Sequence, residues 1–339
     1  MAVKICVYGA GAIGGYLAAR LHDAGADVSL IARGPHLAAI QNSGLKLKMG
    51  EETHVYNLKA SNIPSDFGKQ DYIIIALKAH GITQITEEIE PLLGTNTAVV
   101  SAVNGLPWWY FFKANTNTGL DDKFLQSVDP DGKIWNSIGA ERAIGCVVYP
   151  ACEISKPGTI THIEGERISL GEPSGEMTER MKILSELMIK GGIKAPQKKR
   201  IRDEIWIKLW GNCSFNPVSA LTGASLDKIA EDPSTRQLVK DIMQECKAIG
   251  ETLSVRFAVS IEDRINGAGK IIGHKPSTRQ DIEMKRPLEI DPIMSAIIEI
   301  GNKLKIPTPM LKHINSILKL KADYLGLYNR NELIEKLTI

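Results

Sequence analysis

Hydrophobic and polar positions follow two different patterns along this chain, and the pattern changes near residue 198. In the first part, short runs of β-branched and apolar residues are separated by segments with helical spacing. The strands expected from these runs comprise residues 3–8, 28–32, 71–77, 97–102, 143–149, 158–164 and 167–171. Continuous apolar strands that alternate with helices predict a parallel sheet covered on both faces, whereas the strands after residue 140 are expected to be antiparallel or mixed.

Beyond residue 198, apolar residues recur at helical spacing only. Leu238, Ile242, Cys246 and Ile249 form one such row. The helices expected there comprise residues 200–215, 234–253, 261–267, 292–305 and 308–324. The sequence therefore predicts an α/β protein in which a Rossmann-type doubly wound sheet, residues 1–198, precedes an all-helical domain, residues 199–339.

A glycine-rich turn follows the first expected strand. Gly9-Ala10-Gly11-Ala12-Ile13-Gly14 matches the pattern G-x-G-x-x-G and opens a helix expected over residues 12–24. In that context Gly9 permits the tight turn, Gly11 lets the backbone approach a pyrophosphate, and Gly14 lets helix and strand pack closely. Glycines that serve packing alone are the simpler alternative, but the strand–turn–helix context favours a dinucleotide site.

The end of the second strand distinguishes between the two nicotinamide dinucleotides. An NAD site usually has Asp or Glu there to bind the ribose 2′-hydroxyl. This chain instead has Ile31-Ala32-Arg33-Gly34. A planar guanidinium can bind a 2′-phosphate through two N–H groups, so Arg33 favours NADP over the alternative of a solvated surface arginine.

A polar stripe interrupts an apolar segment of the helical part. Lys208, Asn212 and Asn216 are four residues apart, which places them within about 80° of one helix face. Taken singly, the lysine could extend along Trp206 and Trp210 toward water, and Asn216 precedes a proline where the helix is expected to end or kink. Taken together, the three polar residues indicate the wall of a binding site.

A second group of polar residues lies between residues 276 and 292. Ser277 and Gln280 have the spacing of a capping box, and Asp291 before Pro292 has the pattern of a helix N-cap. A capped helix N-terminus can also receive a substrate carboxylate. Glu289 has no such structural explanation and is the stronger candidate for a functional acid.

These residues together resemble the ketopantoate reductases, relatives of the 6-phosphogluconate dehydrogenases. The resemblance covers nearly the whole chain and rests on the glycine turn, Arg33, Leu77-Lys78-Ala79, Asn104-Gly105, Lys208-x-x-x-Asn212-x-x-x-Asn216-Pro217, and Ser277-x-x-Gln280-Asp281 with Glu289-Ile290-Asp291. It implies NADPH-dependent reduction of a 2-oxo acid to a 2-hydroxy acid, with ketopantoate of pantothenate synthesis as the first candidate substrate.

The resemblance also implies roles for single residues. Lys208 would be the general acid, and Glu289 a carboxylate near the lysine, substrate and cofactor. Substrate contacts would come from Asn212, Asn216, Ser277 and Gln280, and cofactor contacts from Gly9, Ala10, Gly11, Ala12, Ile13, Gly14, Arg33, Lys78, Asn104 and Ala151. An ammonium suits this chemistry because hydride transfer builds negative charge on oxygen. Since a free lysine has a pKa of ~10.4, partial burial near the two tryptophans is expected to lower the pKa of Lys208.

Three departures from the family pattern leave the substrate open. One is the loop after the lysine helix, where an asparagine is expected and the chain has Thr222-Gly223-Ala224-Ser225-Leu226. Residues 106–138 form a long segment that begins with the aromatic run Pro107-Trp108-Trp109-Tyr110-Phe111-Phe112. It could be a lid, an interface or core, and we favour a lid or pocket wall. Pro150 also stands where polar residues are expected. The alternatives are a paralogous 2-hydroxy acid dehydrogenase with another substrate, or a non-catalytic NADP-binding protein.

Composition excludes several other classes. With 41 basic and 39 acidic residues, the net charge of +2 offers no electrostatic basis for binding nucleic acid. Five separated cysteines without a C-x-x-C pair, and seven scattered histidines, indicate neither a disulfide framework nor a metal site. No apolar run approaches the ~18 residues of a membrane span, and the glycines near the N-terminus argue against a signal peptide. We expect a cytoplasmic enzyme, and the family resemblance suggests a homodimer.

Overall fold

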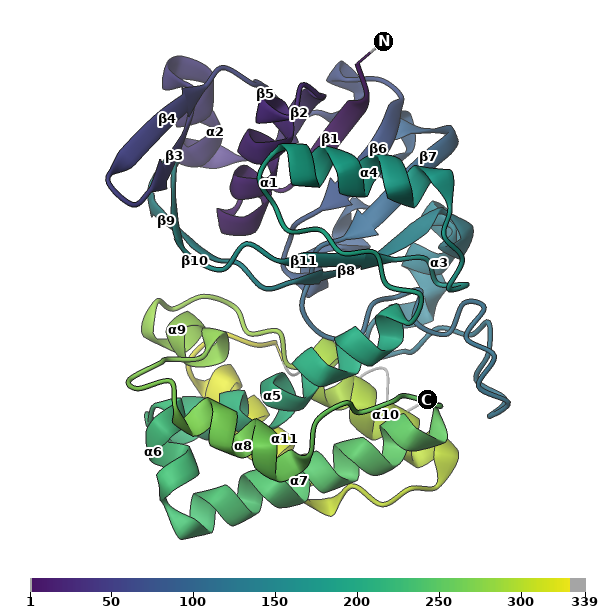
Figure 1. Cartoon of the computed structure of the whole chain (residues 1–339), viewed down its shortest axis with the longest axis vertical. Coiled ribbons are helices and arrows are strands. Elements are labelled where there is room, and N and C mark those ends of the chain that lie inside the picture. Colours follow the sequence, from purple (N-terminus) through teal and green to yellow (C-terminus); the bar gives the residue numbers. More distant parts are fainter. Residues whose placement is uncertain (1, 330–339) are drawn as a thin grey trace. The chain divides into compact units, whose positions relative to one another are not determined.

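The computed structural model describes residues 2–329, and the chain forms two compact units (Figure 1). Within the described residues, unit 1 comprises residues 2–115, Asp122–Phe124 and Asp129–Glu204, and unit 2 comprises Thr116–Asp121, Leu125–Val128 and residues 205–329. The chain therefore passes for the last time from unit 1 to unit 2 after Glu204. The predicted domain boundary at residue 198 lies before this point and stays a prediction.

Unit 1 is built around a seven-stranded sheet with the strand order β11-β8-β7-β6-β1-β2-β5. Its strands are β1 (Lys4–Tyr8), β2 (Asp27–Ile31), β5 (Lys59–Ser61), β6 (Gln70–Ile75), β7 (Leu93–Ser101), β8 (Ala143–Val148) and β11 (Ile168–Gly171). All neighbouring pairs are parallel except β8 and β11, which run antiparallel. This mostly parallel sheet confirms the expected Rossmann-type α/β fold. Its central strands are buried on both faces, as their continuous apolar sequences predict.

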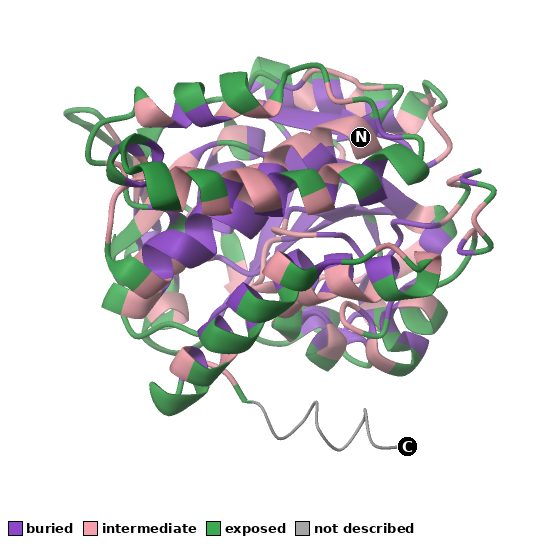
Figure 2. Cartoon of the chain, turned by 90° about the horizontal axis from the view of Figure 1, so that it is seen from below, coloured by how far each residue is buried: buried purple, intermediate pink, exposed green. Residues whose placement is uncertain are grey.

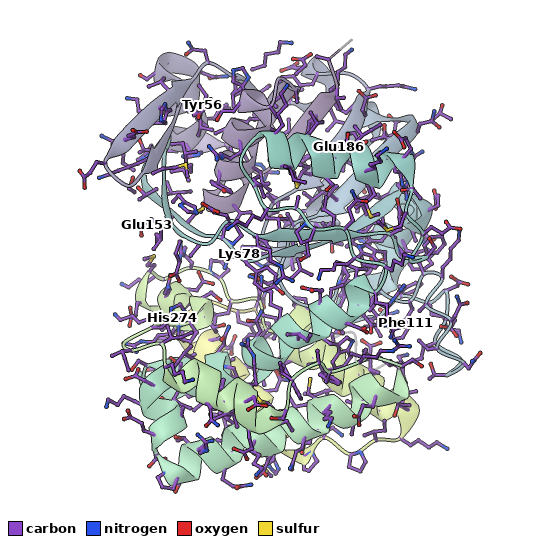
Figure 3. All side chains as sticks on the ribbon, viewed as in Figure 1. Tyr56, Lys78, Phe111, Glu153, Glu186 and His274 are labelled. Atoms are coloured by element: carbon purple, nitrogen blue, oxygen red, sulfur yellow. The ribbon has the colours of Figure 1, made fainter. Side chains whose placement is uncertain are left out.

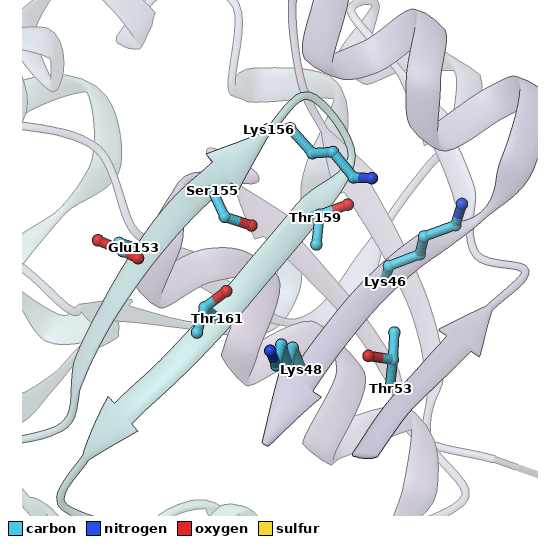
Figure 4. Close-up of a pocket in the computed structure, with 8 residues that line it drawn as sticks. All are labelled: Lys46, Lys48, Thr53, Glu153, Ser155, Lys156, Thr159 and Thr161. Carbon is cyan, nitrogen blue, oxygen red and sulfur yellow. The ribbon is translucent and has the colours of Figure 1, made fainter. Parts of the chain in front are cut away.

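A second sheet of unit 1 was not expected from the sequence. It has the order β4-β3-β10-β9, formed by β3 (Leu45–Met49), β4 (Glu52–Tyr56), β9 (Ala151–Lys156) and β10 (Thr159–Glu164). The strand signal was nevertheless present in Leu45-Lys46-Leu47-Lys48-Met49, which alternates buried leucines with more exposed lysines. The outer face carries a polar hollow lined by Lys46, Lys48, Thr53, Glu153, Ser155, Lys156, Thr159 and Thr161 (Figure 4). None of the predicted site residues lines that hollow.

Helix α1 (Ala12–Asp23) lies between the two sheets, because it contacts β1 and β2 on one side and β3, β9 and β10 on the other. Its small residues make this possible: a Cβ on Gly15 would lie 2.7 Å from Cγ1 of Ile160. The other helices of unit 1 are α2 (Gly34–Ser43), α3 (Lys133–Ile138) and α4 (Glu179–Lys190). Short 3-10 turns connect β6 to β7.

The aromatic run after residue 106 is buried. Trp108, Trp109, Tyr110 and Phe111 are at most 3% exposed. The indole of Trp109 packs against Gly145 of β8, where a Cβ would lie 2.8 Å from the ring, and its Nε1 donates to the Ser101 hydroxyl at 3.0 Å. These residues do not form an exposed lid, because burial of so much aromatic surface is more favourable than exposure.

Unit 2 is helical within the described residues, as expected. It contains most of α5 (Ile201–Thr222), followed by α6 (Leu226–Glu231), α7 (Pro233–Thr252), α8 (Ile261–Gly269), α9 (Ser277–Glu283), the π-helical turn η7 (Asp291–Ser295), α10 (Ala296–Leu304) and α11 (Pro309–Tyr324). The helices bury one side and expose the other (Figure 2). On α7 the buried row is Val239, Ile242, Met243, Cys246 and Ile249, which matches the predicted row closely.

Helix α5 continues through Pro217, so the predicted end near residue 215 is wrong. Proline removes one helical hydrogen bond, at a cost of about 3 kcal/mol in a helix interior. The residues on both sides are almost completely buried, with Phe215 at 3%, Val218 at 2% and Ala220 at 4% exposure. Their apolar burial, each side chain contributing about 1–3 kcal/mol, outweighs the lost bond.

Candidate active site

The predicted cofactor residues of unit 1 follow neighbouring parallel strands. Arg33 follows β2, the glycine turn follows β1, Lys78 follows β6 (labelled in Figure 3), and Asn104 follows β7. Ala151 begins β9 shortly after β8 ends. Because β8, β7, β6, β1 and β2 are consecutive in the sheet and parallel, their carboxyl ends lie at one edge. Open α/β sheets bind their ligands at that edge.

The three glycines of the turn have different structural requirements. A Cβ on Gly14 would lie 1.8 Å from the Gly9 carbonyl oxygen, and one on Gly9 would lie 2.6 Å from Cδ2 of Leu77. Gly9 also has a φ of 103°, which other residues rarely adopt. A Cβ on Gly11 would meet only the Ala76 carbonyl oxygen, at 4.0 Å. Packing therefore requires Gly9 and Gly14, while Gly11 has space beside it that fits a pyrophosphate at the start of α1.

His36 supports this turn, although the sequence analysis did not select it. Its Nε2 lies 2.7 Å from the Ala10 carbonyl oxygen, and the Gly158 backbone N–H donates to its Nδ1 at 3.0 Å. Because the Gly158 N–H must donate, Nδ1 accepts, and Nε2 carries the proton that it donates to Ala10. Burial lowers the pKa of His36, although the bond to Ala10 acts in the opposite direction. The neutral ring thus links the glycine turn to the β9–β10 hairpin.

Arg33 is exposed at the end of β2, where its backbone is extended before α2. Nη2 of Arg33 lies 3.7 Å from Oε2 of Glu88, which also accepts a hydrogen bond from the Tyr8 hydroxyl at 2.8 Å. Burial, with Glu88 as a smaller cause, raises the pKa of Tyr8, so the hydroxyl remains a donor. No sequence signal beside Arg33 pointed to Glu88, because this carboxylate comes from the turns after β6 rather than from β2.

In unit 2, α5 places Lys208, Asn212 and Asn216 on one face, as expected. The Asn216 Nδ2 donates to the Asn212 Oδ1 at 3.4 Å, and Lys208 is half-buried. Trp206 and Trp210 are fully buried, two residues either side of the lysine and therefore on another face of the helix. The Trp210 Nε1 donates to the Met243 carbonyl at 2.8 Å. This bond links α5 to α7.

The polar group between residues 276 and 292 has different local roles from those expected. Helix α9 begins at Ser277 with Pro276 as its N-cap, and no side chain caps it. The Gln280 side chain donates instead to the Lys275 carbonyl at 2.8 Å. The predicted capping box is therefore wrong, because the helix starts one residue too early for Ser277 to cap it: Ser277 is already its first residue. Ser277 is exposed and Gln280 half-buried, so both remain accessible.

Asp291 is the first residue of the π-helical turn η7, and the prediction that it caps a helix is wrong. The preceding Ile290 already has helical dihedrals, so Asp291 lies inside the turn. Its carboxylate accepts from Ser295 at 2.7 Å and Tyr328 at 2.9 Å, and pairs with Lys319 at 2.7 Å. These contacts give Asp291 a structural role. Glu289 is half-buried and lies two residues before this π-helical segment, and such segments often occur at functional sites.

The described residues contain no group of three or more His, Cys, Asp or Glu side chains that could hold a metal ion. None of the five cysteines, all of which lie in the described part of the chain, forms a disulfide. Among the helices within residues 2–329, none is both long and apolar enough to cross a membrane.

Comparisons with known proteins decide the family. A model described as ketopantoate reductase PanE/ApbA matches residues 5–175, and the model of the same family's C-terminal domain matches residues 200–322. A 2-dehydropantoate 2-reductase from Mesorhizobium japonicum is 49% identical over 328 residues, covering 96% of this chain and 100% of the relative. The chain belongs to the ketopantoate reductase family. Its members are oxidoreductases, so this chain is an enzyme of that class.

Solved structures of ketopantoate reductases share the fold. A Ralstonia solanacearum protein assigned as a ketopantoate reductase superposes with a TM-score of 0.91 at 38% identity, covering 97% of this chain and 100% of that chain. A D-mandelate dehydrogenase crystallised with NADH and anilino(oxo)acetate has a TM-score of 0.81 at 20% identity, with coverage of 96% and 100%. At that identity the second likeness shows the fold alone.

Proposed function

We propose that this chain reduces ketopantoate, a 2-oxo acid, to the 2-hydroxy acid pantoate with NADPH. The relative from Mesorhizobium japonicum carries the substrate assignment, because its identity of 49% extends over 96% of the chain. The choice of NADPH over NADH is supported by Arg33, which stands where an NAD site would have a carboxylate.

The residues of unit 1 fit the dinucleotide. The start of α1 and the space beside Gly11 would receive the pyrophosphate, and the exposed guanidinium of Arg33 would bind the 2′-phosphate. Lys78, Asn104 and Ala151, which follow β6, β7 and β8, would contact the rest of the cofactor. When bound, NADPH supplies a hydride to the carbonyl carbon of the 2-oxo acid.

The residues of α5 and the segment before η7 would handle the proton and the substrate. The ammonium of Lys208 would donate its proton to the carbonyl oxygen as negative charge develops there. The Asn212 oxygen accepts from Asn216, so the Asn212 amide NH2 group can donate to the substrate. Ser277 and Gln280 would bind the substrate carboxylate, and Glu289 would hold the lysine in its charged form through its negative charge.

The experiment that tests this function measures oxidation of NADPH, and separately NADH, with a panel of 2-oxo acids that includes ketopantoate. We expect ketopantoate to have the highest kcat/KM and NADPH to be preferred. Replacement of Arg33 by Ala should weaken NADPH binding by about 10- to 100-fold, because a charge-assisted hydrogen bond contributes about 1.5–3 kcal/mol, and should change NADH binding little.

Three results would change this assignment. Turnover of other 2-oxo acids but not ketopantoate would identify a paralogous 2-hydroxy acid dehydrogenase. Binding of NADPH without turnover of any 2-oxo acid would indicate a non-catalytic NADP-binding protein. An equal loss of NADPH and NADH affinity in the Arg33 variant would reject the assigned role of the guanidinium. The homodimer and the cytoplasmic location remain expectations, for which sedimentation and fractionation of cells are the direct measurements.

A further inference from the structure

The aromatic segment, Pro107–Phe112, has no role in the function proposed so far. It follows directly after Asn104-Gly105, a predicted cofactor contact, and its residues up to Phe111 are buried. Trp109 connects the segment to the end of β7 through its bond to Ser101. The segment therefore extends the edge of the sheet at which the cofactor is expected to bind.

One side chain of helix α5 is held by this segment. The Arg202 Nε donates to the Tyr110 carbonyl at 2.8 Å, Nη2 to the Phe112 carbonyl at 2.7 Å, and Nη1 to the Pro173 carbonyl at 2.6 Å. The guanidinium carbon lies 5.8 Å from the ring centre of Trp109 and 5.6 Å from that of Tyr110. All three nitrogens thus bind backbone, an arrangement that needs the fixed, planar donors of arginine and that lysine cannot reproduce.

A second side chain holds the same turn of α5. The Glu204 carboxylate pairs with Arg167 and with Lys198 Nζ at 2.9 Å, and accepts from the Tyr149 hydroxyl at 3.0 Å. Burial opposes its ionisation, but Lys198, Tyr149 and Arg167 outweigh burial and lower the pKa of Glu204. All of these partners belong to unit 1. The first turn of α5 is therefore anchored in unit 1 by both of its long polar side chains.

The anchored turn and the predicted general acid lie on one continuous helix. Helix α5 extends without interruption from Ile201 to Thr222. Lys208 is six residues beyond Arg202, which corresponds to about 9 Å along the helix axis. An α-helix resists stretching and twisting because its backbone hydrogen bonds are consecutive, so a shift of the first turn also moves the lysine.

We propose that Arg202 is a positioning residue for the reduction: it holds the first turn of α5 on the aromatic segment and so sets where Lys208 lies. The inference rests on the proposed function, which gives Lys208 the proton-donating role. It assigns the aromatic segment a task as the backbone support for this arginine. Misplacement of a reacting group by about 1 Å can reduce the rate by about 100-fold, so such support matters for turnover.

The test compares Arg202→Lys and Arg202→Ala with Arg200→Ala. Arg200 is a matched control, because it lies two residues away and pairs locally with Asp203 at 2.7 Å on the surface. The measurements are kcat and KM for ketopantoate, and the Kd of NADPH from its fluorescence, at a temperature well below the melting point of every variant. We expect kcat to fall by about 10- to 100-fold in the Arg202 variants with less than about threefold change in the Kd of NADPH. The Arg200 variant should resemble the wild type.

A second measurement separates positioning from general support of the fold. Arg202→Lys is introduced into the Lys208→Ala variant, and single turnovers are followed with enzyme in excess. If Arg202 acts through Lys208, its replacement should reduce the rate no further in that background. If Arg202→Lys reduces the rate in the Lys208→Ala background as much as it does when Lys208 is present, its role is merely structural and the inference is overturned. An unchanged kcat in Arg202→Lys would also overturn it.

Failure of the two proposals can be told apart. If the wild-type enzyme turns over no 2-oxo acid, the proposed function fails and the positioning role fails with it. If the wild-type enzyme is active and the Arg202 variants are equally active, only the positioning role fails. Should Arg202→Ala not fold, Arg202→Lys retains the charge and most of the side-chain volume and decides the question.

Discussion

The carboxylate of Glu88 lies 3.7 Å from the guanidinium of Arg33, the residue expected to meet the 2′-phosphate of NADPH. The Tyr8 hydroxyl donates to the same carboxylate at 2.8 Å and holds it beside the arginine. The pair is exposed, with 64% of the Arg33 side chain and 50% of the Glu88 side chain accessible. Glu88 therefore orients the guanidinium but also places a negative charge close to where a second anion would bind.

Replacement of Glu88 by Gln should strengthen NADPH binding. The amide keeps the side-chain volume and removes the repulsion of a 2′-phosphate, which at an exposed site corresponds to about 0.2–1 kcal/mol, or a decrease of up to about fivefold in Kd. NADH lacks that phosphate, so its Kd should stay within twofold. Titration of cofactor fluorescence measures both. Glu87→Gln, an exposed neighbour, is the control, and a weaker affinity for NADPH in Glu88→Gln would show that orientation of Arg33 outweighs repulsion.

Two substitutions in the glycine turn should affect different properties: Gly14→Ala the stability of the fold, and Gly11→Ala the affinity for NADPH. Gly14→Ala would bring a Cβ to 1.8 Å from the Gly9 carbonyl oxygen and should destabilise the fold, with loss of soluble protein or a large decrease in melting temperature. Gly11 has a φ of −65° and space for a Cβ, so Gly11→Ala should melt within a few degrees of wild type. Its NADPH affinity should nevertheless fall by at least about tenfold, because the methyl group fills the space expected for the pyrophosphate. Unchanged affinity in Gly11→Ala would exclude the cofactor from this space.

Protonation of His36 should decrease the stability of the protein in mild acid. Burial lowers its pKa below the ordinary value of 6.5, so between these two values the unfolded chain binds the proton more readily than the folded one. The contribution of the neutral ring is present above pH 6.5 and is lost as the pH falls toward the lowered pKa. Protonation would place a hydrogen on Nδ1, which accepts from Gly158.

The measurement is the free energy of unfolding by urea for wild type and His36→Gln between pH 8 and pH 5. The advantage of the wild type should shrink as the pH falls, because glutamine does not titrate. His54→Gln is the control, since His54 is 57% exposed and lies on β4. A constant difference between wild type and His36→Gln across this range would contradict the assigned neutral form.

Lys208→Ala should abolish most turnover and leave the cofactor affinity intact. Loss of a general acid costs about 100- to 10,000-fold in kcat, and the phosphate turn and Arg33 do not depend on this side chain. Lys228→Ala is a suitable control, because Lys228 pairs with Glu231 on the surface of α6 at 2.8 Å. Stopped-flow measurement of NADPH oxidation, together with its Kd, checks the result. Normal turnover in Lys208→Ala would require another proton donor.

Several features could be predicted from the sequence because they depend on local spacing. A strand, three glycines and a helix in succession form a tight turn, and four-residue spacing places Lys208, Asn212 and Asn216 on one helix face. The carboxyl ends of the parallel strands then bring Arg33, Lys78 and Asn104 to one edge of the sheet, since continuous apolar strands that alternate with other segments predict a parallel sheet.

Other features were decided only by tertiary packing. The burial of Phe215 and Val218 carries α5 through Pro217, against the local preference of proline. Glu88 and His36 reach Arg33 and Ala10 from separate elements, and no local spacing records such contacts. The sequence of the aromatic run is compatible with a lid and with core packing, because apolar surface is stable wherever a partner surface covers it. Only the position of β8, against which Trp109 packs, distinguishes the two. Sequence alone thus determined the parts whose geometry is local, and packing decided which distant groups support them.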